Sequence, residues 1–303
     1  MKILVTGANG LLGQKLSLLL DSKEDIELVA TARSSPSIQL KRGAFQLLDI
    51  TNQAEVNEII SQVQPEVIIN TAAMTQVDHC ETEQEKCWLS NVTAVAYLVK
   101  ACEKEKVRLI HVSTDFIFDG TQGALKENAK PNPVNYYGKS KLAAEKIIQE
   151  SNIEWAILRT VLVFGITSDL SRSNIVLWVK KNLEEGKVIN VVNDQWRTPT
   201  LAEDLAMGCY LATIKNARGI YHISGEEMMT PYDIAVETAK FFDLDRSLIK
   251  PTDSTTFKQP AARPLKTGFD ITKAKAELGY TPHTFTDGLA ILASQIQKLS
   301  ANK

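Results

Sequence analysis

Nine residues near the N-terminus carry the strongest structural signal in the chain: Val5-Thr6-Gly7-Ala8-Asn9-Gly10-Leu11-Leu12-Gly13. A short apolar run, residues 2–5, precedes them, and leucines at helical spacing follow. The pattern GxxGxxG permits a tight strand-to-helix turn, close approach of a pyrophosphate and close helix–sheet packing, and the helix N-terminus favours phosphate. A glycine turn alone is a weak signal, but the flanking strand and helix favour dinucleotide binding. The residues expected to contact the cofactor are Gly7, Asn9, Gly10, Leu11, Leu12 and Gly13.

Apolar runs and helical patterns alternate through the first half of the chain. The runs at residues 26–30, 45–48, 67–69, 107–112 and 155–158 are typical of buried parallel strands. Helical patterns occupy residues 53–62, 85–105 and 137–150. This order predicts an α/β fold with a Rossmann-type, doubly wound parallel sheet, in which the carboxyl ends of the strands meet at the ligand-binding edge.

Composition and charge exclude several classes of protein. The 303 residues are 44% hydrophobic and 23% charged, and the net charge of −2 provides no general basic field for nucleic acid or anionic membrane. The apolar start is too short for a signal peptide, and no stretch has the length of a membrane span. The four cysteines and four histidines show neither CxxC nor HxxxH spacing. We therefore expect reduced thiols, no metal site and a cytoplasmic location.

An arginine occupies the position that distinguishes the two nicotinamide dinucleotides. An acidic residue about 20 positions after the glycines binds the ribose 2′-hydroxyl of NAD. Arg33 stands there instead, flanked by hydroxyl side chains, and a guanidinium suits a 2′-phosphate. The charge therefore favours NADPH, with NADH as the alternative. Further cofactor contacts are expected where the third and fourth strands end, at Asp49, Ile50, Thr71, Ala72 and Ala73.

A second group of polar residues surrounds the fifth strand and the helix after it. Thr114 ends the strand, and Tyr137 and Lys141 follow at a spacing of four, so the last two share one helix face. An ammonium beside a phenol lowers the phenol pKa from about 10, which suits a proton donor to a carbonyl. The Thr114 hydroxyl is expected to polarise the carbonyl oxygen, and Lys141 to hold the nicotinamide ribose as well. Tyr136 is a competing candidate for the phenol, but the residue four positions after it is Ser140, which carries no charge.

Five segments carry a resemblance to a known family: NTAAMTQVD (70–78), HVSTDFIFDG (111–120), YGKSKLAAE (137–145), DQWRTPT (194–200) and ARP (262–264). Over nearly its full length the chain resembles the extended short-chain dehydrogenase/reductase family, and within it the dTDP-4-dehydrorhamnose reductases. The resemblance implies Thr114, Tyr137 and Lys141 as the catalytic set, with Asn91 near the site. It implies NADPH-dependent reduction of the C4 ketone of a nucleotide-linked 6-deoxy-4-ketohexose, a step of dTDP-rhamnose biosynthesis. It also implies substrate contacts by Thr75, Val77, Asp115 and Phe116.

The segment that should bind the sugar departs from the family pattern. Phe116 stands where the family often has tyrosine. Within residues 159–165, Leu162 stands where the family has tryptophan. An aromatic platform for the sugar is therefore missing, or is supplied by Trp178 or Trp196. The resemblance thus favours a reductase of this type more strongly than it favours one particular sugar.

The rhythm of the sequence changes after about residue 160. Helical patterns at residues 168–185, 203–214, 231–243 and 287–299 alternate with short strands at 188–192 and 220–223. We expect residues 1–160 to form the NADP(H)-binding domain with the catalytic residues. Residues 161–303 are expected to form mainly a smaller C-terminal α/β substrate lobe, with returns of the chain to the main sheet allowed. Candidate substrate ligands in this lobe are Asp194, Gln195, Arg197 and Arg263, of which the arginines suit a diphosphate.

Two further interpretations of the sequence stay open. One is a sugar-nucleotide epimerase on the same fold, which can use the same tyrosine and lysine; a dehydratase is disfavoured because Asp115 is followed by Phe116 and not by a second carboxylate. The other is a non-catalytic, NADP-binding regulatory subunit similar to methionine adenosyltransferase beta. Fold alone does not separate these functions. The expected partner is a small nucleotide sugar, and a homodimer is allowed.

Overall fold

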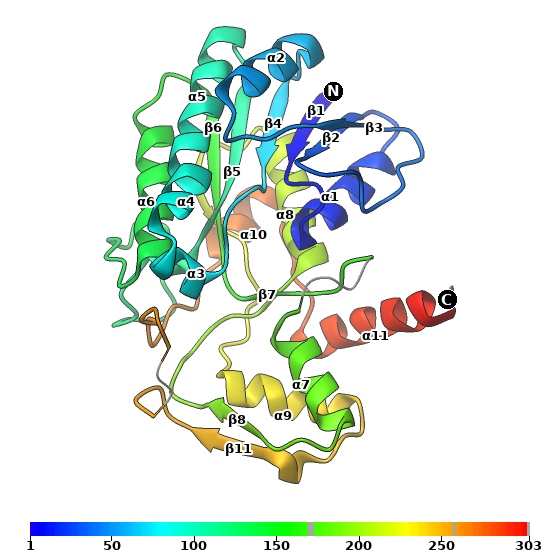
Figure 1. Ribbon diagram of the computed structural model, residues 1–303, viewed down its shortest axis with the longest axis vertical. Helices are drawn as coiled ribbons and strands as arrows, with labels where there is room; N and C mark the ends of the chain where they lie inside the picture. Colours follow the sequence, from blue (N-terminus) through cyan, green and yellow to red (C-terminus); the bar gives the residue numbers. More distant parts are fainter. Residues whose placement is uncertain (169–172, 257–258, 302–303) are drawn as a thin grey trace.

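A central sheet of seven parallel strands forms the larger lobe of the computed structural model, which describes residues 1–168, 173–256 and 259–301 (Figure 1). The strand order is β10-β6-β5-β4-β1-β2-β3, so the direction of winding reverses between β1 and β4. Ligands bind at this switch point in doubly wound sheets. The predicted Rossmann-type sheet is confirmed. Its strands are β1 (Lys2–Thr6), β2 (Glu27–Ala32), β3 (Ala44–Leu47), β4 (Val67–Asn70), β5 (Arg108–Thr114), β6 (Trp155–Thr160) and β10 (Gly219–His222).

Helices cover both faces of the sheet, because successive strand side chains point to opposite sides. Ile3 and Val5 belong to one hydrophobic core, under helices α1 (Leu11–Asp21), α8 (Ala202–Ile214) and α10 (Thr272–Leu278). Leu4 belongs to the other core, under α2 (Gln53–Val63), α5 (Ala94–Glu105) and α6 (Tyr136–Gln149). No helix within the described residues is long and apolar enough to cross a membrane.

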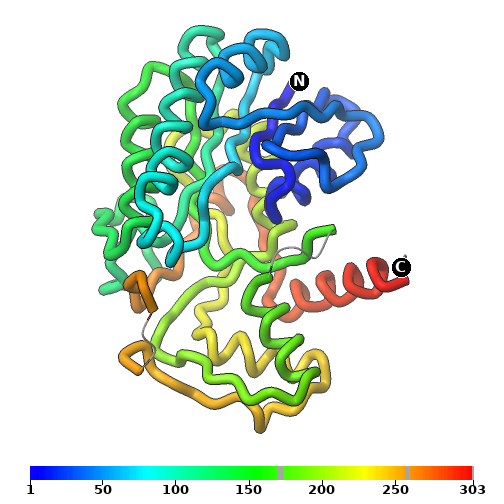
Figure 2. The backbone as a smooth tube through the Cα atoms, viewed as in Figure 1, coloured from blue at the N-terminus to red at the C-terminus, as the bar shows by residue number. Residues whose placement is uncertain are grey.

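Two separate stretches of chain build the smaller lobe. Figure 2 shows a green stretch and a yellow-to-orange stretch side by side below the sheet, where β8 (Ile189–Val192) pairs in parallel with β11 (Ile249–Thr252). Between them the chain returns to the main sheet as β10, beside β6. A short pair, β7 (Val163–Phe164) with β9 (Thr200–Leu201), lies where the chain enters and leaves this lobe. Its helices are α7 (Ile175–Glu184), α9 (Pro231–Phe241) and α11 (Phe285–Ala301).

Two predicted helices differ from the structure. The pattern at residues 85–105 is not one helix: α4 (Gln84–Trp88) passes through a single π-helical turn, Leu89–Thr93, before α5 begins. The pattern at 168–185 begins as a helix only at Ile175, where the Asn174 side chain accepts from the Leu177 amide at 3.3 Å. Ser168 lies before it in a turn, held by the Gln14 side chain at 2.9 Å, and residues 169–172 lie outside the described residues. Several short elements were not among those predicted: the helices α3 (Val77–Thr82) and α10, the strands β7, β9 and β11, and the 3-10 turns at Asp115–Ile117 and Arg246–Leu248.

Candidate active site

The glycine turn between β1 and α1 leaves no room for side chains. Gly7 has a φ of +74°, and a Cβ there would lie 2.8 Å from the backbone of Ala72. A Cβ on Gly13 would lie 2.1 Å from the Gly7 carbonyl oxygen. Both glycines are therefore required by close backbone approach, at Gly7 between the turn and the loop after β4, and at Gly13 between α1 and the turn itself.

The N-terminus of α1 is a suitable anion site. Gly10 is the N-cap residue and has no side chain that could accept from the first amides of the helix. The first turn of the helix carries no acidic residue. The amides of this turn and the positive end of the helix dipole are then available to a pyrophosphate. The glycine cradle and the uncapped helix together fit a nicotinamide dinucleotide.

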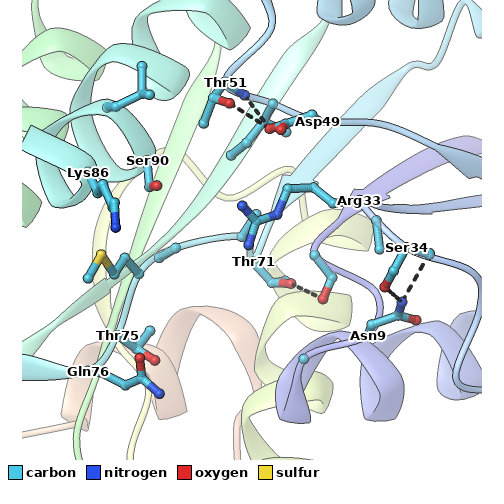
Figure 3. A pocket seen from close by; sticks show the side chains of 18 of the residues that line it. Asn9, Arg33, Ser34, Asp49, Thr51, Thr71, Thr75, Gln76, Lys86 and Ser90 are labelled. Carbon is cyan, nitrogen blue, oxygen red and sulfur yellow. Dashed lines mark hydrogen bonds between the residues drawn. The ribbon is translucent and has the colours of Figure 1, made fainter. Parts of the chain in front are cut away.

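A pocket of about 640 Å³ runs along the carboxyl ends of the strands from this turn. Figure 3 shows Arg33 pointing into it from the end of β2, with Lys86 and Ser90 on the opposite wall. Asn9 donates to Ser34 Oγ at 3.0 Å and so fixes the loop that follows Arg33. The exposed guanidinium and the neighbouring hydroxyl form a suitable site for a 2′-phosphate.

Most of the predicted cofactor residues line this pocket. They are Gly7, Asn9, Gly10, Arg33, Asp49, Ile50, Thr71, Ala72 and Ala73. The Asp49 carboxylate accepts from the amide of Thr51 at 2.9 Å and from its hydroxyl at 2.7 Å. Leu11, Leu12 and Gly13 belong to the first turn of α1 and do not line the pocket, so their contact with the cofactor stays a prediction.

The sequence did not predict several polar side chains of the pocket, among them Thr51 and Lys86. Thr51 lies beside Asp49, and Lys86 extends from α4 and pairs with Glu83 at 2.9 Å. Only a correct prediction of where α4 begins could have placed Lys86 at the pocket. Thr75, a predicted substrate residue, lies at the far end of the pocket next to Met74.

Thr114 and Tyr137 lie side by side beyond Met74. Thr114 ends β5 and its hydroxyl accepts from the Phe116 amide at 3.2 Å. Tyr137 lies in the first turn of α6, 8% exposed, with its ring edge against Phe116 at 5.8 Å between centroids. Burial raises the pKa of Tyr137 above its ordinary value, and the Thr114 hydroxyl beside it acts in the opposite direction. The neutral phenol is therefore the stable form in this environment.

Lys141 lies one turn further along α6 but does not pair with the phenol. Its Nζ donates to the Val112 carbonyl at 2.8 Å and lies 3.0 Å from His111 Nε2. Burial lowers the pKa of Lys141 to about 8. The expectation that this ammonium lowers the phenol pKa is wrong for the arrangement seen here, because burial raises the Tyr137 pKa and the opposing influence comes from the Thr114 hydroxyl and not from Lys141.

Asn91 lies in the π-helical turn and holds the loop after β4. Its side chain accepts from the Met74 amide at 2.8 Å, donates to the Met74 carbonyl at 3.0 Å, and donates to Ser140 Oγ at 3.0 Å. The extra residue of a π turn is frequently found at functional sites, and here it aims an amide between the pocket and α6. Asn91 thus lies near the site, while its contact with the cofactor stays a prediction.

A buried ion pair anchors α6 to the sheet. Arg159 of β6 donates to both carboxylate oxygens of Glu145, at 3.0 and 2.7 Å, and both residues are nearly inaccessible. Bidentate geometry of this kind fixes orientation as well as distance. The pair therefore sets the position of the helix that carries Tyr137 and Lys141.

Two of the predicted substrate residues form a buried contact between the lobes. Asp115 is 1% exposed, accepts a hydrogen bond from Thr267, and lies 3.7 Å from Arg197 Nε. Arg197 also donates to the carbonyls of Pro264 and Trp196, at 2.6 and 2.8 Å. Burial raises the pKa of Asp115, and the guanidinium opposes that rise. Both side chains hold segments 264–267 and 115–116 together in this structure.

The other substrate candidates lie apart from one another. Arg263 forms two bonds to Asp78 of α3, at 2.7 and 2.8 Å, next to Val77. Asp194 accepts from the Ser254 amide at 2.9 Å and so holds a backbone turn. Gln195 is buried beside it, 9% exposed. Arg263 is thus close to the start of α3, whereas Asp194 follows β8 in the smaller lobe.

Comparison with known proteins decides the family. The sequence matches the RmlD substrate binding domain family over residues 1–298. The chain belongs to this family. It is 30% identical to the probable low-salt glycan biosynthesis reductase Agl14 of Haloferax volcanii, over 99% of this chain and all of that protein. It is 34% identical to methionine adenosyltransferase 2 subunit beta of Xenopus laevis, over 90% of this chain and 81% of that protein. It is also 32% identical to the dTDP-4-dehydrorhamnose reductase of Aggregatibacter actinomycetemcomitans, over 93% and 94%.

Solved structures agree with the family. A dTDP-4-dehydrorhamnose reductase of Clostridium acetobutylicum superposes with a TM-score of 0.87 at 29% identity, covering 98% of this chain and 100% of that one. The reductase of Bacillus anthracis, in complex with NADP, gives 0.83 at 25% identity, covering 97% and 99%. UDP-glucuronic acid 4-epimerase of Bacillus cereus, with NAD, gives 0.84 at 25%, covering 99% and 100%. The predicted resemblance to this NAD(P)-dependent oxidoreductase family is confirmed.

Proposed function

We propose that the protein reduces the C4 ketone of a nucleotide-linked 6-deoxy-4-ketohexose with NADPH, and that Tyr137 is the proton donor. One observation carries this proposal. The buried Tyr137 lies beside the Thr114 hydroxyl and packs with Met74, and Met74 lines the pocket that the exposed Arg33 also lines.

The residues support a reduction in the following way. When bound, the reduced nicotinamide supplies a hydride to the carbonyl carbon. The Thr114 and Tyr137 hydroxyls are suited to donate to the carbonyl oxygen, where negative charge develops. Tyr137 is kept as a neutral phenol by burial, so it has a proton to give. The apolar surroundings of Tyr137, formed by Met74, Val77 and Phe116, exclude water from the proton transfer.

The sugar nucleotide is proposed as the substrate class because relatives bearing that chemistry in their names span the whole chain. Arg263 supports the proposal, since it is only partly buried and its carboxylate partner can be exchanged for a diphosphate of the same charge sign. Phe116 offers an apolar face to the sugar in place of a hydroxyl. NADPH is preferred over NADH because Arg33 and Ser34 line the ribose end of the pocket.

The test follows the loss of reduced-nicotinamide absorbance. The purified chain is mixed with NADPH or NADH and with enzymatically prepared dTDP-4-keto-6-deoxyhexoses, with Tyr137→Phe as the control. We expect turnover that prefers NADPH and collapses in the variant. NADPH binding without turnover of any ketosugar would refute the proposed reaction. Interconversion of epimers without net consumption of NADPH would replace it with an epimerase.

A second candidate function is a nucleotide-binding subunit without catalysis. The observation that favours it is the 34% identity to methionine adenosyltransferase 2 subunit beta. The intact Thr114, Tyr137 and Lys141 favour the reductase instead, since a non-catalytic protein has no need of a buried phenol beside a carbonyl-binding hydroxyl. Co-purification with a methionine adenosyltransferase catalytic subunit, together with absent turnover, would support this second function.

A further inference from the structure

Four buried polar side chains form a continuous chain across the sheet to Lys141. Thr6 on β1 donates to Asn70 Oδ1 on β4 at 2.6 Å, and Asn70 Nδ2 lies 3.0 Å from His111 Nδ1 on β5. His111 Nε2 then lies 3.0 Å from Lys141 Nζ on α6. Thr6, Asn70 and His111 are fully inaccessible, and Lys141 is 2% exposed. These strands are neighbours at the switch point of the sheet.

The orientation of the Asn70 amide is determined by its other contacts. Oδ1 accepts from the Thr6 hydroxyl and also from the backbone amide of Ala72 at 3.2 Å. A backbone N–H only donates, so the atom facing it must be the oxygen. The Nδ2 group therefore faces His111, and because it carries only donors, His111 Nδ1 must accept. A neutral imidazole that accepts at Nδ1 carries its proton on Nε2.

This tautomer has a consequence for Lys141. The Nε2–H group points at Nζ, and it can form a hydrogen bond only with a lone pair on that nitrogen. An ammonium has three donors and no lone pair, whereas an uncharged amine has one. The amine can still donate to the Val112 carbonyl, as the distance of 2.8 Å requires.

We propose that Asn70 and His111 are positioning residues that favour the uncharged amine of Lys141 over its ammonium, because they aim at Nζ a donor that only the lone pair of the amine can accept. The consequence for catalysis rests on the reductase function proposed above. Protonation of Lys141 costs this hydrogen bond, so the contact opposes formation of the ammonium that would favour a phenolate. His111 thereby sets the pH range in which Lys141 carries charge.

Some of the other groups around Lys141 lower its pKa and others raise it. Burial lowers the pKa of Lys141 to about 8, in the same direction as the His111 donor. Glu145 on its own helix, Cys87 on α4 and Cys80 on α3 act in the opposite direction. The Glu145 carboxylate is compensated by Arg159 at 2.7 Å. Burial and the neighbouring Lys141 keep the pKa of His111 well below its ordinary value, so a second proton on the ring does not compete.

Two spectroscopic readings on the nucleotide-free full chain test the proposal without any substrate. A nitrogen–proton correlation spectrum of [15N]histidine protein shows which ring nitrogen of His111 carries the proton, assigned by loss of the signal in His111→Asn. A [13Cε]lysine titration reports the pKa of Lys141, assigned by Lys141→Arg. We expect the Nε2–H tautomer and a Lys141 that titrates below the ordinary lysine value of about 10.4. An Nδ1–H tautomer, or a Lys141 that titrates with the surface lysines, would overturn the proposal.

Two variants then separate positioning from simple packing. His111→Asn keeps an acceptor in place of Nδ1 but removes the Nε2–H group, so the pKa of Lys141 should rise by about one unit, the size expected for one lost hydrogen bond to the amine. In Asn70→Asp the carboxylate can only accept a hydrogen bond, so the His111 ring should carry its proton on Nδ1. His111 Nε2 then becomes an acceptor for Lys141, and the pKa of Lys141 should rise further. The control His222→Asn removes another buried histidine, on β10, and should leave the Lys141 pKa unchanged. An unchanged Lys141 pKa in both test variants would also overturn the proposal.

The pH dependence of kcat/KM is a separate test. If the chain turns over a ketosugar, the alkaline limb of kcat/KM should move about one pH unit upward in His111→Asn, leaving about tenfold more of the maximal rate at pH values above the wild-type limb. A chain with no turnover would refute the proposed function but would leave the tautomer and the lysine titration as tests of the positioning role. A limb that does not move, with a Lys141 pKa that does, would show that Lys141 charge does not control the reaction.

Discussion

Two basic side chains, Arg33 and Lys141, lie in opposite environments. Arg33 follows the end of β2, and its exposed guanidinium lines the pocket. Lys141 lies on α6, 2% exposed, with a carbonyl and an imidazole as its neighbours. Water stabilises the first charge, whereas burial opposes the second.

This difference separates recognition from chemistry. A permanently charged, exposed group suits the recognition of a phosphate, and its contribution is weakened by salt. A buried amine changes its charge with pH and with its partners, which suits a group that controls a proton. Perturbing the buried end should therefore cost more than perturbing the exposed end.

The largest effect is expected at the buried phenol. Tyr137→Phe keeps the ring that packs on Phe116 but removes the proton, so kcat should fall by about 10²–10⁴, the usual contribution of a general acid. The Kd for NADPH, from fluorescence titration, should rise by no more than about tenfold, since one hydrogen bond is lost. Turnover within tenfold of wild type would show that another group donates the proton.

The next effect concerns the ion pair under α6. Arg159→Met leaves Glu145 buried without its partner and should lower the free energy of unfolding by about 3–5 kcal/mol, measured in urea. The double variant with Glu145→Met should recover most of that loss, because no uncompensated charge remains. A single variant within about 1 kcal/mol of wild type would contradict the role of this pair in holding the helix.

A smaller effect is expected at the exposed end. Arg33→Ala should raise the KM for NADPH by roughly 10–100-fold, the value of one charge-assisted contact of about 1.5–3 kcal/mol, and leave the KM for NADH unchanged. Added salt should raise the NADPH KM of the wild type more than that of the variant. Equal loss for both cofactors would mean that Arg33 supports the loop and does not read the 2′-phosphate.

The smallest effect is a dependence of stability on pH. Burial lowers the pKa of His222 to about 3 and that of His111 well below its ordinary value. Below pH ~6.5 the unfolded chain therefore binds more protons than the native protein. As the pH falls, each histidine lowers the free energy of unfolding by about 1.4 kcal/mol per pH unit. His222→Asn should reduce the slope of unfolding free energy between pH 6.5 and 5 by about one histidine's share. An unchanged slope would show that His222 takes up its proton in the native state.

Local signals in the sequence predicted the parts of the site that depend on the backbone. The strand before Gly7 and the leucines after Gly13 indicated the nucleotide turn, because steric limits leave only glycine at these positions. The spacing of Tyr137 and Lys141 placed them on one helix, as α6 shows. The apolar runs predicted where the first six strands lie along the chain, since buried parallel strands have few polar residues.

Contacts between distant segments could not be predicted in the same way. Nothing near Asp115 in the sequence indicates that Thr267 and Arg197 lie beside it. The π-helical turn at Asn91 continues the helical pattern on either side of it, so the sequence predicted a single helix over residues 85–105. The contact of Lys141 with His111 likewise depends on how α6 packs over β5, and the sequence suggested a pairing with Tyr137 instead.

Transfer of deuterium from the cofactor to the sugar tests the central claim most directly. The chain is incubated with dTDP-4-keto-6-deoxyhexose and NADPH that carries deuterium at the transferable position of the nicotinamide, and the sugar product is examined by mass spectrometry and NMR. We expect one deuterium, bound to C4 of the product, and none with Tyr137→Phe over the same time. Oxidation of NADPH without deuterium at C4, or no product under any condition that permits cofactor binding, would contradict it.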